Sequence, residues 1–309
     1  MPRTGLPESE IMTAPFPASP PAQSSASSCV HILHEIRALP LPLDEALFRH
    51  YPGMKFGRPQ HLSFFSRQLA LVAQKLVRQA PRHDWVLTAP PYFQLPAAAN
   101  LLAGQVQQIL LQQGLGTALY PLRLQAGKQG MRNAQEFANA YNYSKNSLAQ
   151  RVAERERVQQ MLDTDGLASA LQGKQVIVIN DINVTGTQQK FIQQTMDQMQ
   201  VAGVHWLYIF QVEPALAASH PEIEHQINTS QLADLDSYAA VLDDSTTQHT
   251  ARCISRLFNE DMAAFRQVLA RLSPRAMEQI YRLARLEERY DSEIFAEKMA
   301  LLGEVPCLV

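Results

Sequence analysis

The sequence predicts an α/β fold: a parallel sheet with helices on both faces, joined to an all-helical C-terminal part. Three observations predict this class. Short apolar runs alternate with amphipathic stretches between residues 85 and 212. The run Val176–Ile179 is β-branched throughout, as in strands that are buried on both faces. After Pro214 the pattern becomes helical only. Strands that are separated by helices favour parallel pairing.

The N-terminal third of the sequence predicts one long helix. Residues 1–28 are dense in Pro, Ser and Ala without an apolar period, which predicts a disordered leader. Residues 30–57 are interrupted by prolines and predict only short elements. Residues 62–80 predict an amphipathic helix that Pro81 ends. Its apolar stripe consists of Leu62, Phe65, Leu69, Val72 and Leu76.

The middle of the chain supplies the sheet. Trp85–Ala89 is a short apolar strand, and the helix after it has Gly114 at its C-terminal end. The polar, Gly/Asn-rich segment 126–147 is expected to be a loop. The other elements predicted here are a helix at 95–113, strands at 117–124, 176–179 and 204–212, and helices at 148–161 and 188–202.

The C-terminal part is expected to be helical. Ser273 and Pro274 form a helix start signal, with Ser as the cap and Pro in the first turn. The predicted helices are 248–258, 260–272, 274–286 and 291–302. The expected organisation is a leader at 1–28, an α/β domain at 29–213 with its core at 85–212, and a helical subdomain at 214–309.

Composition excludes several classes. Among 309 residues, Lys+Arg of 27 against Asp+Glu of 29 leaves no basic surplus, so no nucleic-acid partner is expected. No apolar run approaches the roughly 18 residues that span a bilayer, so no membrane partner is expected. The scattered Cys29, Cys253 and Cys307 favour neither a disulfide framework nor a metal site. We therefore expect a cytoplasmic protein.

One stretch, Val176–Gln188, carries a chemical signal. A buried strand leads into the carboxylate of Asp181, then a small turn with Thr185-Gly186-Thr187, then a helix. Ligands of open α/β sheets bind beyond the carboxyl ends of strands, and a helix N-terminus with hydroxyl groups suits a phosphate. Gly186 lets the backbone approach that phosphate. Asp181 is suited to bind sugar hydroxyls or a hydrated Mg²⁺. The alternative is a plain βα turn in which Thr185 caps the helix.

Val176–Gln188 resembles the phosphoribosyl-pyrophosphate signature of type I phosphoribosyltransferases. Asn180 stands where the first acidic residue of that signature usually is, and Asp181 matches the second. The 5′-phosphate loop corresponds to Asn183, Val184, Thr185, Gly186, Thr187 and Gln188. The departures are Asn180, which removes a carboxylate, and Val184 and Gln188, which replace common threonines.

Other segments support the resemblance. Thr88 to Tyr92 is similar to the family's pyrophosphate loop, in which ComF-like members also carry prolines; its expected ligand groups are on Ala89, Pro90, Pro91 and Tyr92. The segment 126–147 lies where the family has a mobile loop, with Lys128 and Arg132 as pyrophosphate ligands. Met54–Gly57 is similar to a Lys-Tyr-Gly element near the start of some members. A weaker resemblance is to phosphoribosyltransferase-like proteins encoded beside tellurium-resistance genes.

The resemblance implies a transferase that passes phosphoribosyl from phosphoribosyl pyrophosphate to a nitrogen acceptor and releases pyrophosphate. Asp181, helped by Asn180, would hold the ribose hydroxyls, and Mg²⁺ would be the cofactor, held by Asp181 through waters. The expected partner is a phosphorylated sugar or a nucleotide, and a homodimer is compatible with this interpretation. Two alternatives stay open: a non-catalytic nucleotide-sensing or partner-binding protein on the same fold, and phosphorolysis in the reverse direction.

Two smaller signals have a structural explanation. His31 and His34 have the spacing of a metal-binding pair on a helix, but no third ligand is evident, and a solvated or packed pair is the expectation. Arginines concentrate in the C-terminal helices, where glutamates offset much of their charge. These arginines are Arg252, Arg256, Arg271, Arg275, Arg282, Arg285 and Arg289.

Overall fold

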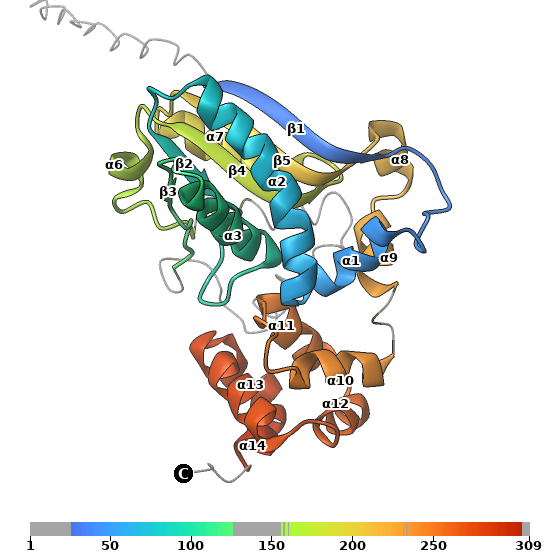
Figure 1. The fold of residues 1–309 in the computed structure, drawn as a ribbon. Helices are drawn as coiled ribbons and strands as arrows, with labels where there is room; N and C mark the ends of the chain where they lie inside the picture. The colour runs from blue at the N-terminus through green and yellow to red at the C-terminus, as the bar shows by residue number, and fades with distance from the viewer. Residues whose placement is uncertain are drawn as a thin grey trace, which may run out of the picture.

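The computed structural model describes residues 26–125, 156, 158–159, 161–230, 232 and 234–304. Within them lies a five-stranded sheet of order β1-β5-β4-β2-β3, in which neighbouring strands pair in parallel (Figure 1). The strands are β1 Ser27–Ile36, β2 Trp85–Thr88, β3 Ala118–Leu119, β4 Gln175–Asn183 and β5 Gly203–Val212. The predicted α/β class with a parallel sheet is confirmed.

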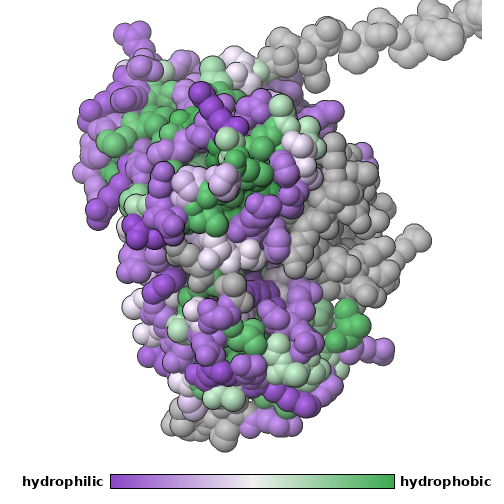
Figure 2. Space-filling model, turned by 90° about the vertical axis from the view of Figure 1, so that its right-hand side faces the viewer, coloured by the Kyte–Doolittle hydropathy of each residue, from purple (hydrophilic) through white to green (hydrophobic). Residues whose placement is uncertain are grey.

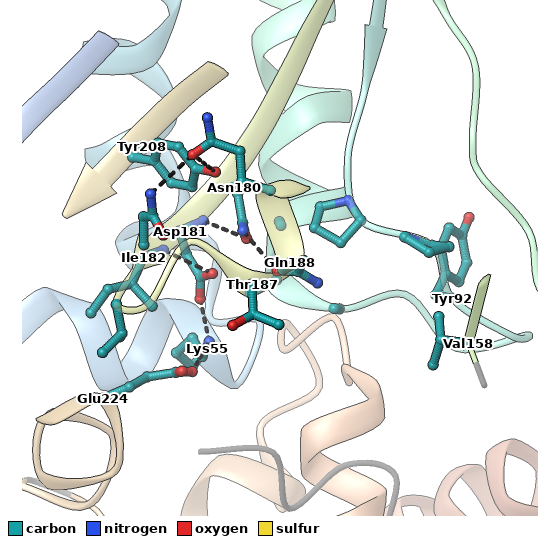
Figure 3. A pocket seen from close by; sticks show the side chains of 18 of the residues that line it. Lys55, Tyr92, Val158, Asn180, Asp181, Ile182, Thr187, Gln188, Tyr208 and Glu224 are labelled. Atoms are coloured by element: carbon teal, nitrogen blue, oxygen red, sulfur yellow. Dashed lines mark hydrogen bonds and ion pairs between the residues drawn. The ribbon is translucent and has the colours of Figure 1, made fainter. Parts of the chain in front are cut away.

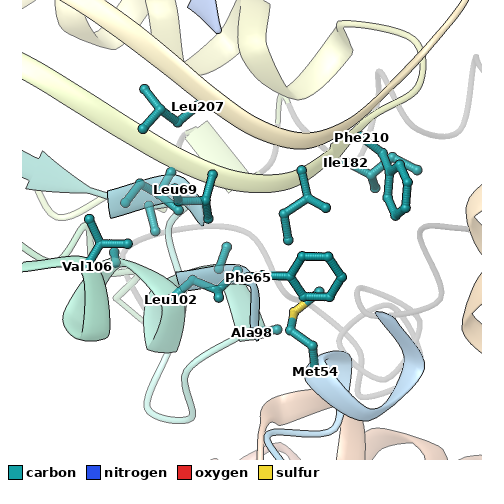
Figure 4. Close-up of a cluster of buried hydrophobic side chains, with 14 of the residues drawn as sticks. Met54, Phe65, Leu69, Ala98, Leu102, Val106, Ile182, Leu207 and Phe210 are labelled. Atoms are coloured by element: carbon teal, nitrogen blue, oxygen red, sulfur yellow. The ribbon is translucent and has the colours of Figure 1, made fainter. Parts of the chain in front are cut away.

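The centre of the sheet is apolar on both faces. In β4 the side chains of Ile177 and Ile179 belong to one buried cluster, and those of Val176 and Val178 belong to another, because neighbouring side chains of a strand point to opposite faces. The first cluster includes residues of α1 (Ala46–Lys55), α2 (Pro59–Gln79) and α3 (Ala98–Gln112), part of which Figure 4 shows. The second includes residues of α6 (Leu167–Leu171) and α7 (Thr187–Gln198). Helices therefore cover both faces, as predicted.

All elements described after β5 are helical. They are α8 Pro214–Ser219, α9 Ile223–Thr229, α10 Leu235–Asp243, α11 Ala251–Asn259, α12 Met262–Leu269, α13 Pro274–Leu286, the 3₁₀ helices Arg289–Asp291 and Glu293–Phe295, and α14 Ala296–Gly303. The helices α10–α14 have their own apolar cluster, which also takes in Phe56 and Leu95 from the sheet-bearing part. Of these helices, α11 lies nearest to that part in Figure 1.

Hydrogen bonds join the start of α11 and the residues just before it to the end of α1 and to the loop between β2 and α3. Thr250 Oγ1 donates to the carbonyl of Lys55 (2.9 Å), and Ala251 N–H donates to the carbonyl of Pro96 (3.0 Å). Gln248 N–H donates to the carbonyl of Gly57 (3.0 Å). The start of α11 is thereby fixed against the ends of α1 and of the loop before α3.

The surface of the described part mixes polar and apolar side chains. Figure 2 looks onto the side of the molecule where β1, α1 and α8 lie, and apolar patches interrupt the polar surface there. Val30 and Ile32 of the edge strand β1 are 44% and 42% exposed. Among the described residues, no helix combines the length and the apolar character that crossing a membrane requires.

Several boundaries differ from the sequence prediction. Strand β1 was not predicted, and it begins at Ser27, within the predicted leader 1–28. It is an edge strand whose only fully buried residue is Ile36, so its sequence lacks the apolar run of a central strand. The strand predicted at 117–124 is reduced to Ala118–Leu119 plus two isolated bridges.

The sequence predicted the presence of the longer helices correctly but placed some of their ends differently. The helix 62–80 is α2 and the helix 274–286 is α13, whereas the helix 188–202 ends at Gln198. The short helices α8, α9 and α10 were not among the predicted helix ranges. Each is only about two turns long, which is too short to show a clear apolar period in the sequence. The segment 126–147, and most of the helix predicted at 148–161, lie outside the described residues.

Gly57 provides a test of how the two parts are joined. Its φ is +82°, and a Cβ there would meet the carbonyl oxygen of Gln248 at 1.9 Å. Gly114 also has a positive φ of +74°, but a Cβ there would meet nothing within 4 Å. We expect Gly114→Ala to cost about 1–2 kcal/mol of stability, from backbone conformation alone. Gly57→Ala should cost about 2–5 kcal/mol, because overpacking adds about 1–3 kcal/mol. Urea unfolding of both variants checks this, and equal losses would contradict the close approach.

Candidate functional site

A cavity of about 170 Å³ opens at the carboxyl ends of β4 and β2. Its walls come from the loop after β2, from residues 180–189 at the end of β4 and the start of α7, and from the end of α1. Glu224 of α9, which Figure 3 labels, also lines it. So does Arg252 of α11. This is the edge of an open α/β sheet at which ligands bind.

The loop between β4 and α7 has the geometry of an anion site. Strand β4 continues through Asn183, two residues beyond Asp181, so the turn consists of residues 184–186 and is shorter than predicted. Gly186 has φ +70°, and a Cβ there would meet nothing within 4 Å. The hydroxyls of Thr185 and Thr187 are 2.9 Å apart. Lys190 N–H donates to Gly186 O in the first turn of α7, and the N-terminal end of a helix favours an anion.

Amide side chains shape this loop. Asn183 Oδ1 accepts the N–H of Gly186 (2.9 Å), which closes the turn. Asn183 Nδ2 donates to Gln189 Oε1 (3.0 Å) and to Gln211 Oε1 (2.9 Å). Tyr208 OH also donates to Gln189 Oε1 (3.2 Å), and burial raises the pKa of this tyrosine. The loop is therefore anchored to β5 and to the first turn of α7.

Asn180 takes part in a second amide pair. Its Nδ2 donates to Gln188 Oε1 (2.9 Å), and its Oδ1 accepts the N–H of Asp181 (2.9 Å). Two of the three residues that depart from the signature, Asn180 and Gln188, thus bind each other across the strand end. This pair connects the position of the missing carboxylate to the start of α7.

Four charged side chains meet at this cavity, those of Asp181, Lys55, Glu224 and Arg252. Lys55 Nζ donates to Asp181 Oδ2 and lies 3.0 Å from Glu224 Oε1, and Arg252 Nη2 lies 3.7 Å from the same Glu224 oxygen. Tyr51 OH donates to Asp181 Oδ2 (3.1 Å), and burial, followed by the charge of Asp181, raises the pKa of Tyr51 well above its usual value. The two cations balance the two carboxylates, and Tyr51 stays a hydrogen-bond donor.

The loop after β2 is rigidly held. The guanidinium of Arg123 lies 4.1 Å from the centre of the Tyr92 ring and donates to Phe93 O (3.0 Å). Asn100 Nδ2 donates to Pro90 O (3.0 Å). Farther along, Glu287 Oε1 accepts the N–H of Leu95 (2.5 Å), which ties the loop to the end of α13. Burial raises the pKa of Glu287.

This geometry changes the expectation for pyrophosphate. Pro90 and Pro91 line the cavity but have no N–H to donate, and the N–H of Tyr92 donates to Leu122 O (3.2 Å). Ala89 is 2% exposed and is not among the lining residues. The loop therefore offers shape and carbonyl groups rather than the row of backbone donors that a pyrophosphate loop supplies.

Most of the predicted site residues meet at this cavity. They are Asn180, Asp181, Asn183, Val184, Thr185, Gly186, Thr187, Gln188, Pro90, Pro91 and Tyr92. Lys128 and Arg132 lie outside the described residues. Sequence reasoning missed Tyr51, Glu224 and Arg252 as site residues, and it noted Lys55 only as part of the Met54–Gly57 element. That element was a usable signal for Lys55, whereas nothing local distinguishes Glu224 or Arg252.

The His31 and His34 pair lies on strand β1 instead of a helix. His31 Nε2 is 3.3 Å from His205 Nδ1, and His34 Nε2 is 3.4 Å from Gln68 Oε1. Burial lowers the pKa of both His31 and His205. The packed interpretation of the pair is the one that the structure supports.

One family model matches the chain over most of its length. A family model described as PRTase ComF-like matches residues 33–302, most of the chain and most of its C-terminal helices. No curated protein matches. Among solved structures, a hypoxanthine phosphoribosyltransferase from Staphylococcus aureus is similar at 12% identity and a TM-score of 0.28. That similarity covers 47% of this chain and 64% of the other, so this chain spans just under two thirds of that protein's length.

The role of Asn183 in the turn can be tested by hydrogen exchange. Asn183→Ala removes the acceptor of the Gly186 N–H, whose loss at about 1 kcal/mol corresponds to roughly fivefold faster local exchange. Gln211→Ala is the matched control, because it removes a partner of Asn183 but leaves the bond to Gly186. Deuterium uptake of a peptide spanning residues 184–190 should rise in the first variant only. Equal uptake in both variants would show that Asn183 does not hold the turn.

Proposed function

Because the chain belongs to the ComF-like phosphoribosyltransferase family, we propose that its cavity binds phosphoribosyl pyrophosphate and that the protein transfers the phosphoribosyl group to a nitrogen acceptor. One observation carries this proposal: the hydroxyl-rich turn at the start of α7 and the Asp181 carboxylate open into the same cavity. A sugar phosphate needs this combination, an anion site next to an acceptor of hydroxyl hydrogen bonds.

The 5′-phosphate is assigned to the turn at the start of α7. Thr185 and Thr187 offer hydroxyl donors, and the open space at Gly186 gives the phosphate access to the backbone. The end of a helix adds favourable electrostatics for an anion. Val184 and Gln188 complete the wall of this subsite.

The ribose hydroxyls are assigned to Asp181. Its carboxylate is about nine-tenths buried and is held by Lys55 and Tyr51, so its position is fixed before a ligand arrives. A positioned group lowers the entropic cost of bringing the reacting atoms together. Asn180 fixes the Asp181 backbone from the other side.

The pyrophosphate is assigned to the wall formed by Pro90–Tyr92 and to cations around it. Since that loop has few backbone donors, positive side chains are the more important ligands. The cations among the described lining residues are Lys55 and Arg252, and Lys128 and Arg132 belong to the proposal through the family resemblance.

In the proposed reaction, an acceptor nitrogen forms a bond to C1 of the ribose while the bond from C1 to pyrophosphate breaks. Pyrophosphate leaves with the electron pair of that bond. The protein's part is to position the sugar and to stabilise the charge of the leaving group. The acceptor is assigned to the side of the cavity near Glu224 in α9.

Mg²⁺ is the cofactor that the family resemblance implies, and the residues at 180–181 fit a directly bound ion poorly. Asp181 Oδ2 accepts from Lys55 and Tyr51, and its Oδ1 accepts from Ile182 N–H (3.0 Å). The Asn180 oxygen accepts from the backbone. Three protein donors use three of the roughly four acceptor sites of the Asp181 carboxylate, which leaves room for a hydroxyl donor but not for the several oxygen ligands that a hard cation needs. No step of the proposal passes through a protein-bound metal; contact through waters stays a prediction.

A second candidate function is a nucleotide-sensing protein on the same fold that binds the ligand without turning it over. The side chain of Asn180 favours this sensing function. Its amide donates to Gln188 within the protein, and it provides no carboxylate beside that of Asp181. Pyrophosphate release with candidate acceptor bases distinguishes the two, since only the transferase produces it.

Ligand binding should raise the melting temperature of the protein. Binding to the native state alone adds about 2.7 kcal/mol at a hundredfold excess of phosphoribosyl pyrophosphate over its Kd. Asp181→Ala should abolish this shift, and Asp165→Ala, at an exposed position outside the cavity, should preserve it. Thermal unfolding with and without the ligand measures the effect. Equal shifts in the wild type and Asp181→Ala would remove Asp181 from the site.

Asn180→Asp separates a ligand-binding role from a structural one. The new carboxylate loses the donation to Gln188, at a cost of about 1–3 kcal/mol unless the Gln188 amide turns to donate instead. We expect the variant to fold and its ligand affinity to depend more strongly on Mg²⁺, because two adjacent carboxylates favour a cation. A Mg²⁺ titration of affinity, beside a denaturation curve, measures both. Lost stability with an unchanged Mg²⁺ response would make Asn180 purely structural.

A further inference from the structure

Lys55 is a buried cation within the proposed ligand site. Its side chain is 10% exposed, as is that of Glu224, and that of Asp181 is 9% exposed. A buried ammonium is costly unless charges of opposite sign surround it. Here one ammonium serves two carboxylates from different elements, β4 and α9. The two carboxylates therefore fix the position of the Lys55 ammonium in the folded protein.

The surroundings hold Lys55 from several sides. Its own carbonyl accepts from Thr250 Oγ1 (2.9 Å), which fixes the end of α1 to the residue before α11. Glu224, the second partner of its ammonium, is contacted in turn by Asn228 Nδ2 (3.5 Å) and by Arg252 (3.7 Å). The side chain of Glu224 thus keeps the ammonium in place next to Asp181 from the α9 side.

We propose that Lys55 is a built-in cation of the phosphoribosyl site, positioned by Glu224. Its ammonium neutralises Asp181 beside the ribose and supplies the positive charge that a divalent ion would otherwise bring there. Ligand binding is therefore largely independent of divalent ions. This inference rests on the proposed function and adds a positioning residue, Glu224, and a metal-independent mode of binding to it.

The charge balance supports this assignment. Lys55 and Arg252 already offset Asp181 and Glu224, so a divalent ion placed against Asp181 would be repelled by the ammonium on the same oxygen. A phosphoribosyl ligand, in contrast, brings hydroxyl groups to Asp181 and negative charge to the two cations. The cluster suits the anionic ligand without a metal.

The first test uses the wild-type protein. Phosphoribosyl pyrophosphate is titrated by calorimetry in excess EDTA and in Mg²⁺, and the two Kd values are compared. Coupling between two ligands is commonly about 5- to 150-fold, and we expect a ratio below about fivefold. Binding in Mg²⁺ alone would overturn the inference and leave the proposed function intact. Absence of binding in both conditions would overturn both.

The second test changes the cation while keeping the charge balance. Lys55→Met alone leaves two carboxylates facing each other, so it is combined with Glu224→Gln, which removes one charge of each sign. In this double variant, Mg²⁺ should improve affinity by more than about tenfold, within the usual range of coupling. Lys190→Met is the control, because Lys190 is exposed on the first turns of α7 and does not line the cavity.

The control variant should keep the wild-type ratio. A double variant whose affinity in EDTA equals that of the wild type would overturn the assignment of Lys55. Circular dichroism checks that the double variant is folded before titration. If the double variant does not fold, the comparison of Kd values in the wild-type protein still tests the inference.

Discussion

The charge of Asp181 is the constraint on which the arrangement of the site depends. A carboxylate at the end of a central strand, about nine-tenths buried, requires donors and an opposite charge close by. Lys55 and Tyr51 from α1 supply them, and Glu224 from α9 and Arg252 from α11 extend the balance. The ion pairs thus connect strand β4, helix α1 and the C-terminal helices α9 and α11 around one cavity. The hydrogen bonds at the start of α11 reinforce the same junction.

A second set of contacts gives the cavity its phosphate end. Asn183 closes the turn before α7 through the Gly186 N–H. Its own amide donates to Gln189 Oε1, and Tyr208 OH donates to the same oxygen. These uncharged groups shape the loop at the start of α7, where the proposed 5′-phosphate subsite lies. The two ends of the cavity therefore differ in the interactions they offer a ligand. The end at the start of α7 offers hydroxyl groups and the helix N-terminus, and the end at Asp181 offers balanced buried charges.

The sequence was most informative where a pattern is local. The β-branched run of β4, the stripe of α2 and the Ser273-Pro274 start signal each predicted an element that the structure contains. Strand β1 escaped because an edge strand buries little of itself, and its pairing with β5 joins residues about 175 positions apart. The stretch from Asn180 to Gln188 was predicted as a site for the same reason, since its pattern is local. Glu224 and Arg252 were not predicted, because only the packing of distant helices brings them to the charge cluster of Asp181.

The central claim is that the cavity at the end of β4 binds a phosphoribosyl ligand in a defined orientation. A crystal structure with phosphoribosyl pyrophosphate bound tests it most directly. The account predicts the 5′-phosphate within hydrogen-bonding distance of Thr185 and Thr187, and the ribose hydroxyls against Asp181, with Lys55 still on that carboxylate. A ligand bound elsewhere, or in the cavity with its phosphate away from the start of α7, would contradict it.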